Sequence, residues 1–132
     1  MRRNRGNPDR LNRGWVTETK LPEVVTLLSE ASSETYDNHA IARVNDHVVQ
    51  ISTMTGPYHW HSHPNSDETF LVVAGGLLIE FEQGELQLAP GQLTTVPRGV
   101  RHRTRPLSDR SVNLTFESAN AETEPSRVRR NS

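Results

Sequence analysis

Hydrophobic positions along most of the chain form short runs that are separated by turn residues. From about residue 39 onward these runs are rich in Val, Ile, Leu, Thr and Phe, the pattern of a β protein. Turn pairs such as Asn45-Asp46 and Gly75-Gly76 lie between them. We expect strands at His39–Val44, His47–Met54, His59–His61, Glu68–Val73, Leu77–Phe81, Gly84–Leu88, Leu93–Val96, Val100–Arg105 and Val112–Phe116. Many short strands without a strong helical period predict an all-β sandwich or closed barrel.

The two ends of the chain depart from this pattern. Apolar residues at 21, 24, 25 and 28, with Pro22 near the start and Glu23 in the first turn, predict a short N-terminal helix. Residues 1–14 and 118–132 are polar and almost without apolar side chains, so we expect disordered tails there. Residues 15–117 are then a single domain.

Composition narrows the class of protein. The 132 residues include no Cys, which excludes disulfides, thiolate metal ligands, iron–sulfur clusters and a cysteine nucleophile. No apolar run approaches the length of a membrane span, and the Arg-rich start is not followed by the apolar stretch of a signal peptide. We therefore expect a cytoplasmic protein with no membrane partner.

Charge is unevenly distributed along the chain. Basic and acidic residues number 15 and 16, but residues 1–14 hold five Arg against the single Asp9, a net charge of +4. Such an arm can contact nucleic acid, yet it has no interleaved aromatic residues and the domain itself is mildly acidic. A solvated tail is the expected state, and nucleic acid is not a favoured partner.

Three of the six histidines occupy alternate positions, at His59, His61 and His63. In an extended strand, alternate side chains share a face and lie about 6.6 Å apart along the chain. Two imidazoles so placed can bind one ion at about 2.0–2.1 Å from each nitrogen. Glu68 follows after a turn at Pro64-Asn65-Ser66 that can bring its carboxylate to the same ion. The pair of histidines alone is equally consistent with surface imidazoles on an edge strand.

The spacing of a larger set of residues is more informative than the pair of histidines. The chain reads His61-x-His63-x4-Glu68-x6-Gly75 and, later, Gly91-x5-Pro97-x-Gly99-x2-His102. Both blocks resemble the two conserved motifs of the cupin superfamily, so the chain is identified as a small single-domain cupin of the cupin 2 type, similar to sugar-phosphate isomerases of that fold.

This resemblance implies a fold and a metal site. The fold would be a double-stranded β-helix of the jelly-roll kind, with the short helix and the tails outside it. His61, His63, Glu68 and His102 would bind one divalent first-row metal ion inside the barrel. Iron, manganese, nickel, zinc and copper all suit three imidazoles and a carboxylate, and the donor set does not choose among them.

Strand parity predicts which side chains face the ion. Val100 and Thr104 share a face with His102, so Arg101, Arg103 and Arg105 should point outward. The same rule places Phe70 and Val72 beside Glu68 in the interior, while Thr69, Leu71 and Val73 face out and favour a homodimer. Arg98 lies in a turn and is free to reach the barrel mouth.

His59 is the candidate catalytic residue. It shares parity with His61 and His63, which makes it a base or an occasional extra ligand, or else a solvent-facing histidine at the rim. Tyr58 and Trp60 are expected to face away from the ion. We expect the interior to contain no carboxylate other than Glu68.

These residues leave two functions open. The first is a metal-dependent enzyme, isomerase-like or dioxygenase-like, that acts on a small polar molecule at an open coordination position. The alternative is a non-catalytic module that senses or binds a metal or small ligand. Because many activities share this fold and ligand set, the choice between them rests on analogy at this stage.

Overall fold

The computed structural model describes residues 35–125. These residues form strands joined by turns and loops, with no helix among them. The strands are β1 (Tyr36–Val44), β2 (His47–Met54), β3 (His61–Ser62), β4 (Glu68–Ala74), β5 (Leu77–Phe81), β6 (Gly84–Leu88), β7 (Leu93–Val96), β8 (His102–Pro106), β9 (Ser111–Ser118) and β10 (Glu124–Pro125). The predicted helix near residues 21–28, the basic tail 1–14 and residues 126–132 lie outside the described residues.

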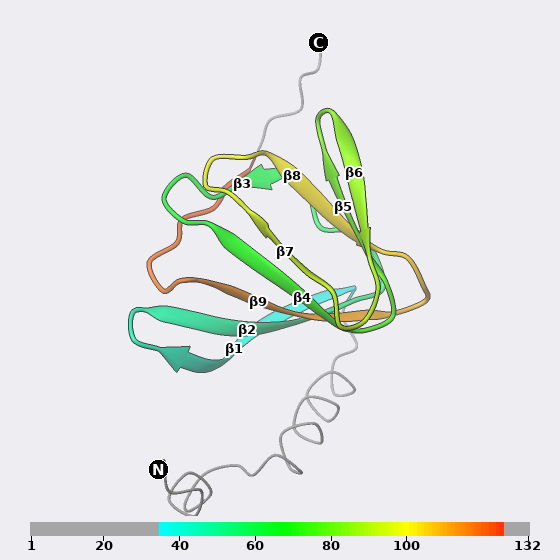
Figure 1. Ribbon diagram of the computed structural model, residues 1–132, viewed down its shortest axis with the longest axis horizontal. Helices are drawn as coiled ribbons and strands as arrows, with labels where there is room; N and C mark the ends of the chain where they lie inside the picture. The colour runs from blue at the N-terminus through cyan, green and yellow to red at the C-terminus, as the bar shows by residue number, and fades with distance from the viewer. Residues whose placement is uncertain (1–34, 126–132) are drawn as a thin grey trace, which may run out of the picture. The chain divides into compact units, whose positions relative to one another are not determined.

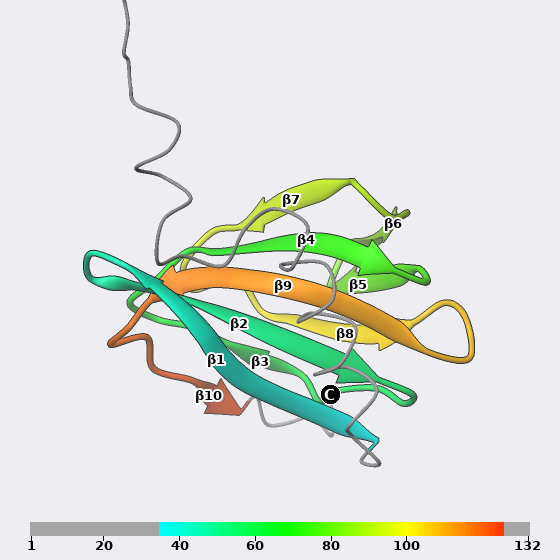
Figure 2. The same ribbon diagram turned by 90° about the horizontal axis from the view of Figure 1, so that it is seen from below.

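The strands form two five-stranded antiparallel sheets. One sheet has the order β1-β2-β9-β4-β7 and the other the order β10-β3-β8-β5-β6. In Figure 1 the first sheet runs upward from β1 through β2, β9 and β4 to β7, and β3, β8, β5 and β6 of the second sheet lie above it; Figure 2 shows the first sheet from its outer side. Strands distant in sequence are neighbours in both sheets, as β2 and β9 are, so the chain winds as a double-stranded β-helix. The predicted fold class is confirmed.

Alternation along the strands produces the core between the sheets. In β4 the buried residues are Glu68, Phe70 and Val72, whereas Thr69 and Leu71 on the opposite face are only half-buried. The buried apolar cluster is made of Met54, Phe70, Val72, Leu77, Ile79, Leu88 and Val96. Because this cluster fills one part of the space between the sheets, the polar residues described below occupy another.

Most predicted strands are confirmed within one or two residues, but the C-terminal boundary is wrong. Residues 118–132 were expected to be a disordered tail, yet β9 continues to Ser118 and β10 pairs with β3, with Glu124 opposite Ser62. The segment contains little apolar surface, and hydrogen bonds hold it instead. Asn65 donates from Nδ2 to the carbonyl of Asn120 (2.9 Å) and accepts from the backbone N–H of Glu122 (2.8 Å). A prediction from apolar content alone misses such polar anchoring.

The outward direction predicted for Arg101, just before β8, and for Arg103 within it is confirmed. Arg103 pairs with Glu80 (2.6 Å) and Arg101 with Glu82 (3.1 Å), and both guanidinium groups lie over the ring of Trp60. Val73 is 39% exposed on the outer face of β4, as predicted. The homodimer inferred from that face stays a prediction.

Candidate metal centre

Four side chains from three separate stretches of the chain meet between the sheets. His61 begins β3, His63 follows that strand directly, Glu68 begins β4 and His102 begins β8. His61 and His102 are cross-strand partners, and their ring centroids are 4.3 Å apart. Each of the four residues offers a ligand atom, and these atoms all lie within 4.8 Å of one another. The structure therefore brings together the four residues that the two motifs predict.

Local turns place these residues. Gly99 has a φ of 80°, a left-handed conformation that favours glycine, and its N–H donates to the carbonyl of His63 (2.8 Å). This bond joins the turn before His102 to the strand end that carries His63. Gly75 also has a positive φ (71°), and a Cβ there would collide with the carbonyl oxygen of Arg110. The motif glycines are thus required by the backbone.

The backbone sets the tautomer of all three histidines. Each Nδ1 lies within hydrogen-bond distance of a main-chain carbonyl, which can only accept, so each Nδ1 carries a hydrogen. The acceptors are the carbonyl of His59 for His61 (2.8 Å), of Glu122 for His63 (2.9 Å) and of Val100 for His102 (2.9 Å). In a neutral ring this leaves the Nε2 lone pair for a metal ion, the arrangement usual for metal-binding histidines.

Unpaired polar atoms at the centre fit a cation. Nε2 of His63 and of His102 and Oε1 of Glu68 are buried and have no hydrogen-bond partner among residues 35–125. Oε1 lies 3.0 Å from Nε2 of His63 and 3.5 Å from Nε2 of His102. With the hydrogens on Nδ1, acceptors face one another at these distances, which is unfavourable unless a cation or a proton lies between them. The donor set and its geometry therefore suit a metal ion.

The charges of the ligands follow from the same contacts. Burial alone would raise the pKa of Glu68, but His102 and His63 outweigh it and lower that pKa to about 2. Burial alone would lower the pKa of His63, but Glu68 and the Glu122 carbonyl raise it to about 9. Burial, assisted by the charge of His102, lowers the pKa of His61 to about 4. In the metal-free protein a proton on His63 therefore balances the Glu68 carboxylate near neutral pH.

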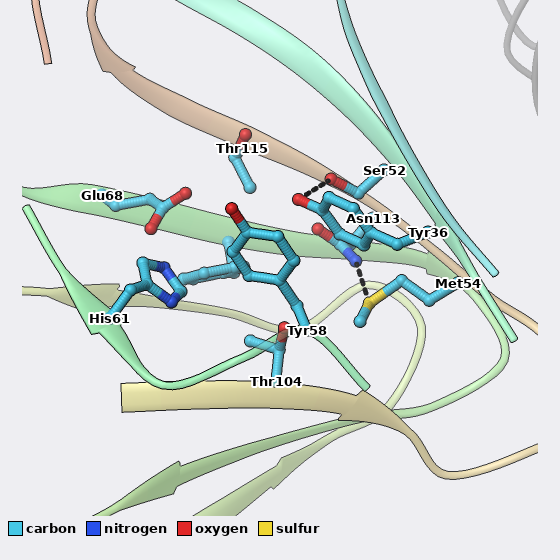
Figure 3. Close-up of a pocket in the computed structure, with 10 residues that line it drawn as sticks. Tyr36, Ser52, Met54, Tyr58, His61, Glu68, Thr104, Asn113 and Thr115 are labelled. Carbon is cyan, nitrogen blue, oxygen red and sulfur yellow. Dashed lines mark hydrogen bonds between the residues drawn. The ribbon is translucent and has the colours of Figure 1, made fainter. Parts of the chain in front are cut away.

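A cavity of about 20 Å³ lies directly beside His61 and Glu68 (Figure 3). Its enclosed volume suits about one water-sized group, and because the cavity is partly open, one hydroxyl group of a larger molecule can also enter it. Residues from both sheets line it: Tyr36, Ser52, Met54, Tyr58, His61, Glu68, Phe70, Thr104, Asn113 and Thr115. Thr104 is buried on the same side as His102, as parity predicts, and Phe70 lies beside Glu68. The cavity gives the centre a place for a small ligand.

Parity fails before β3, with consequences for three residues. The strand begins at His61, not at His59, so the chain ahead of it does not alternate regularly. His59 is exposed and lies outside the group of four; its Nδ1 lies 3.2 Å from the carbonyl of Trp60. Tyr58 was expected to face away from the ion, but it lines the cavity and stacks on Tyr36, with the two ring centroids 4.3 Å apart. Trp60 does face outward, as expected. The catalytic role of His59 stays a prediction.

A second carboxylate lies close to the centre, contrary to expectation. Glu117 is the cross-strand partner of Glu68, and its Oε1 is buried without a hydrogen-bond partner in the part of the chain that the structure describes. Burial, with the charge of Glu68, raises the pKa of Glu117 to about 7. The signal was present in the sequence, because Asn113, Thr115 and Glu117 alternate along one face of β9. The predicted strand ended at Phe116, which left Glu117 out.

Arg98 does not reach the cavity. Its backbone N–H donates to Oδ1 of Asp67 (2.8 Å), and its guanidinium Nε lies 3.8 Å from the same oxygen, in an exposed pair. Arg98, which was expected to be free to reach the barrel mouth, therefore points instead to the turn that carries Asp67.

The clamp formed by Asn65 yields a prediction about metal affinity. Asn65→Ala removes the two side-chain hydrogen bonds from Asn65 to the segment carrying the Glu122 carbonyl, the acceptor for Nδ1 of His63. We expect metal affinity to fall by about 10-fold or more, because partners that orient a ligand are worth that much. Asn120→Ala is the matched control, since Asn120 contributes only its backbone carbonyl. Equal affinities of the two variants by isothermal titration calorimetry would contradict this role.

Comparisons with known proteins agree with the fold. Residues 47–116 match the family described as Cupin domain. The chain is 41% identical over 106 residues to the uncharacterized protein YdbB of Bacillus subtilis (strain 168), covering 80% of this chain and 92% of that protein. These matches show that the chain belongs to the cupin superfamily, as a small single-domain member.

Solved structures share the fold at lower identity. A cupin-2 domain containing protein from Shewanella frigidimarina aligns with a TM-score of 0.66 and 24% identity, over 75% of this chain and 98% of that chain. KdgF from Halomonas sp. aligns with a TM-score of 0.59 and 22% identity, over 73% and 86% of the two chains. Within residues 35–125, no helix is long and apolar enough to cross a membrane.

Proposed function

We propose that this cupin binds one divalent first-row metal ion through His61, His63, Glu68 and His102, and that it binds or converts a small polar molecule at this centre. The observation that carries the proposal is the convergence of four buried ligand atoms within 4.8 Å, with a carbonyl fixing the tautomer of each histidine. Three imidazoles and one carboxylate suit iron, manganese, nickel, zinc or copper and leave coordination positions open.

The activity we propose is that of an isomerase-like or dioxygenase-like enzyme. A bound ion would supply a Lewis acid for a substrate oxygen, or a binding position for dioxygen. The chain would contribute a partly closed cavity beside His61, and Glu117 as a carboxylate near the centre whose pKa of about 7 suits the transfer of a proton. Glu117 is thus a candidate acid–base group in addition to His59, and the sequence analysis did not predict it.

A non-catalytic metal- or ligand-binding module is the second candidate. It is favoured by the position of His59, the predicted base, which is exposed and does not line the cavity. Met54 and Phe70, which do line it, are apolar and provide no group for acid–base chemistry.

Metal content tests the site itself. The purified full chain, incubated with each of the five metals and desalted, should retain about one equivalent of at least one of them by elemental analysis. His61→Ala should lose that metal, whereas His47→Ala should keep it, since His47 is an exposed histidine whose side chain contacts Asp46 and lies outside the group of four. A wild-type chain that retains none of the metals overturns the proposed function.

A second measurement separates enzyme from binding module. The ferrous protein is placed in an oxygen electrode with small hydroxy and keto acids, and the metal-loaded protein is incubated with aldose and ketose pairs and followed by NMR. Oxygen uptake or interconversion that requires both metal and substrate supports the enzyme. Ligand binding without turnover in either assay supports the module.

A further inference from the structure

We propose that the cavity beside the metal centre is a subsite for a small uncharged hydroxylated molecule, and that Asn113 receives its hydroxyl group. This inference rests on the proposed function, because His61 and Glu68 of the metal centre form one wall of the cavity. It adds a chemical class of ligand and a residue that selects it.

Asn113 is in an unusual state for a buried amide. It is 1% exposed on β9, and within the described part of the chain its Oδ1 has no hydrogen-bond partner. Its Nδ2 lies 4.0 Å from the thioether sulfur of Met54, which is a weak acceptor. Buried amides are normally satisfied, and an unpaired one lowers stability unless something else supplies the partner. Because Asn113 lines the cavity, a ligand there can supply the missing donor.

The neighbouring groups match a hydroxyl. Asn38 donates to Oγ of Ser52 (2.6 Å), and Oγ of Ser52 lies 3.5 Å from the hydroxyl of Tyr36. Burial raises the pKa of Tyr36 to about 12, so its hydroxyl keeps its hydrogen. Figure 3 shows Tyr36, Ser52 and Asn113 together at the end of the cavity away from His61. An acceptor on Asn113 and a donor on Tyr36 complement a ligand hydroxyl, which both donates and accepts.

The charge around the cavity argues against an anionic ligand. None of the described residues that line it is Lys or Arg. Arg98, Arg101 and Arg103 pair with Asp67, Glu82 and Glu80 elsewhere. The carboxylates of Glu68 and Glu117 would balance much of the charge of a divalent ion, so a phosphate would be buried without a cationic side chain. The structure thus points away from phosphorylated substrates, although the sequence resembles sugar-phosphate isomerases.

The subsite can be tested with a matched pair of probes. Dihydroxyacetone carries a carbonyl to approach the metal and a hydroxyl to reach Asn113, and dihydroxyacetone phosphate adds only the anion. The full chain is loaded with Co²⁺, whose visible absorption reports changes at the metal, and titrated with each compound. We expect dihydroxyacetone to change the spectrum saturably and the phosphate to bind no more tightly. If dihydroxyacetone phosphate binds about 10-fold more tightly than dihydroxyacetone, the proposal that the ligand is uncharged is overturned.

Variants test the role of Asn113. Asn113→Leu removes the amide at similar volume and should weaken dihydroxyacetone binding about 10-fold or more, with Co²⁺ stoichiometry unchanged. Tyr36→Phe should weaken it as well, which provides a second readout if the leucine variant does not fold. Asn120→Leu, at an exposed asparagine, is the control. Unchanged affinity in both cavity variants would mean that the cavity holds water only.

The outcomes separate this inference from the proposed function. If Co²⁺ binds stoichiometrically and neither probe alters its spectrum, the subsite is overturned and the metal centre stands. If the chain binds neither Co²⁺ nor any of the five metals tested above, both are overturned.

Discussion

Saturating metal is expected to raise the free energy of unfolding by about 4 kcal/mol when the free ion is about 1,000 times its dissociation constant. The reason is that the ligands come from β3, β4, β8 and the loop after β3, so they meet only in the folded chain. For a domain of this size the melting temperature should rise by about 15–30 °C. Thermal unfolding followed by circular dichroism, with Zn²⁺ or Mn²⁺ and after dialysis against EDTA, measures the difference.

Two variants make this result specific to the centre. His102→Gln removes a ligand that is 0% exposed while keeping most of its volume, and it should lose most of the metal-induced shift. His47→Ala changes an exposed histidine at a turn and should keep the shift. An equal shift in His102→Gln and in the wild type would place the stabilising ion elsewhere.

Metal binding is also expected to release about one proton at pH 7. With a pKa of about 9, His63 is protonated in the metal-free protein at this pH, whereas His61, with a pKa of about 4, and Glu68, with a pKa of about 2, have already lost their protons. The metal requires neutral His63, so affinity falls as the pH drops below 9. From pH 7 to pH 9 the apparent affinity should rise about 50-fold, and it should level off about 100-fold above its pH 7 value once the pH is well above 9.

Calorimetry in buffers of different ionisation enthalpy counts the released protons, and competition with a chelator measures affinity at each pH. Glu117, with a pKa of about 7, adds a fraction of a proton near neutrality. Glu68→Gln removes the carboxylate that raises the pKa of His63, so affinity in this variant should level off nearer pH 7. A wild-type chain whose affinity is constant between pH 7 and pH 9 would show that His63 is already neutral when the metal is absent.

The sequence predicted much of the fold because strand alternation is a local property. In β4 and β8 the side chains follow their predicted faces, with Phe70 and Thr104 inside and Arg103 outside. The predicted direction failed where the chain is not a strand, at Tyr58 and His59, because the rule of alternating faces holds only for extended, paired backbone. The C-terminal boundary failed because hydrogen bonds to Asn65 hold a segment that has almost no apolar residues.

By itself the sequence determined the β architecture, because residue type and spacing along strands carry that information. Its resemblance to the cupin motifs then selected His61, His63, Glu68 and His102 as the proposed ligands. Only the tertiary structure decided what surrounds them. Glu117 lies opposite Glu68, Glu122 accepts from His63, and Asn113 faces the cavity with an unpaired oxygen. Each of these relations joins strands or loops that are distant in the chain. The pairing of β4 with β9 and of β10 with β3 creates them, and no local pattern records which strands pair.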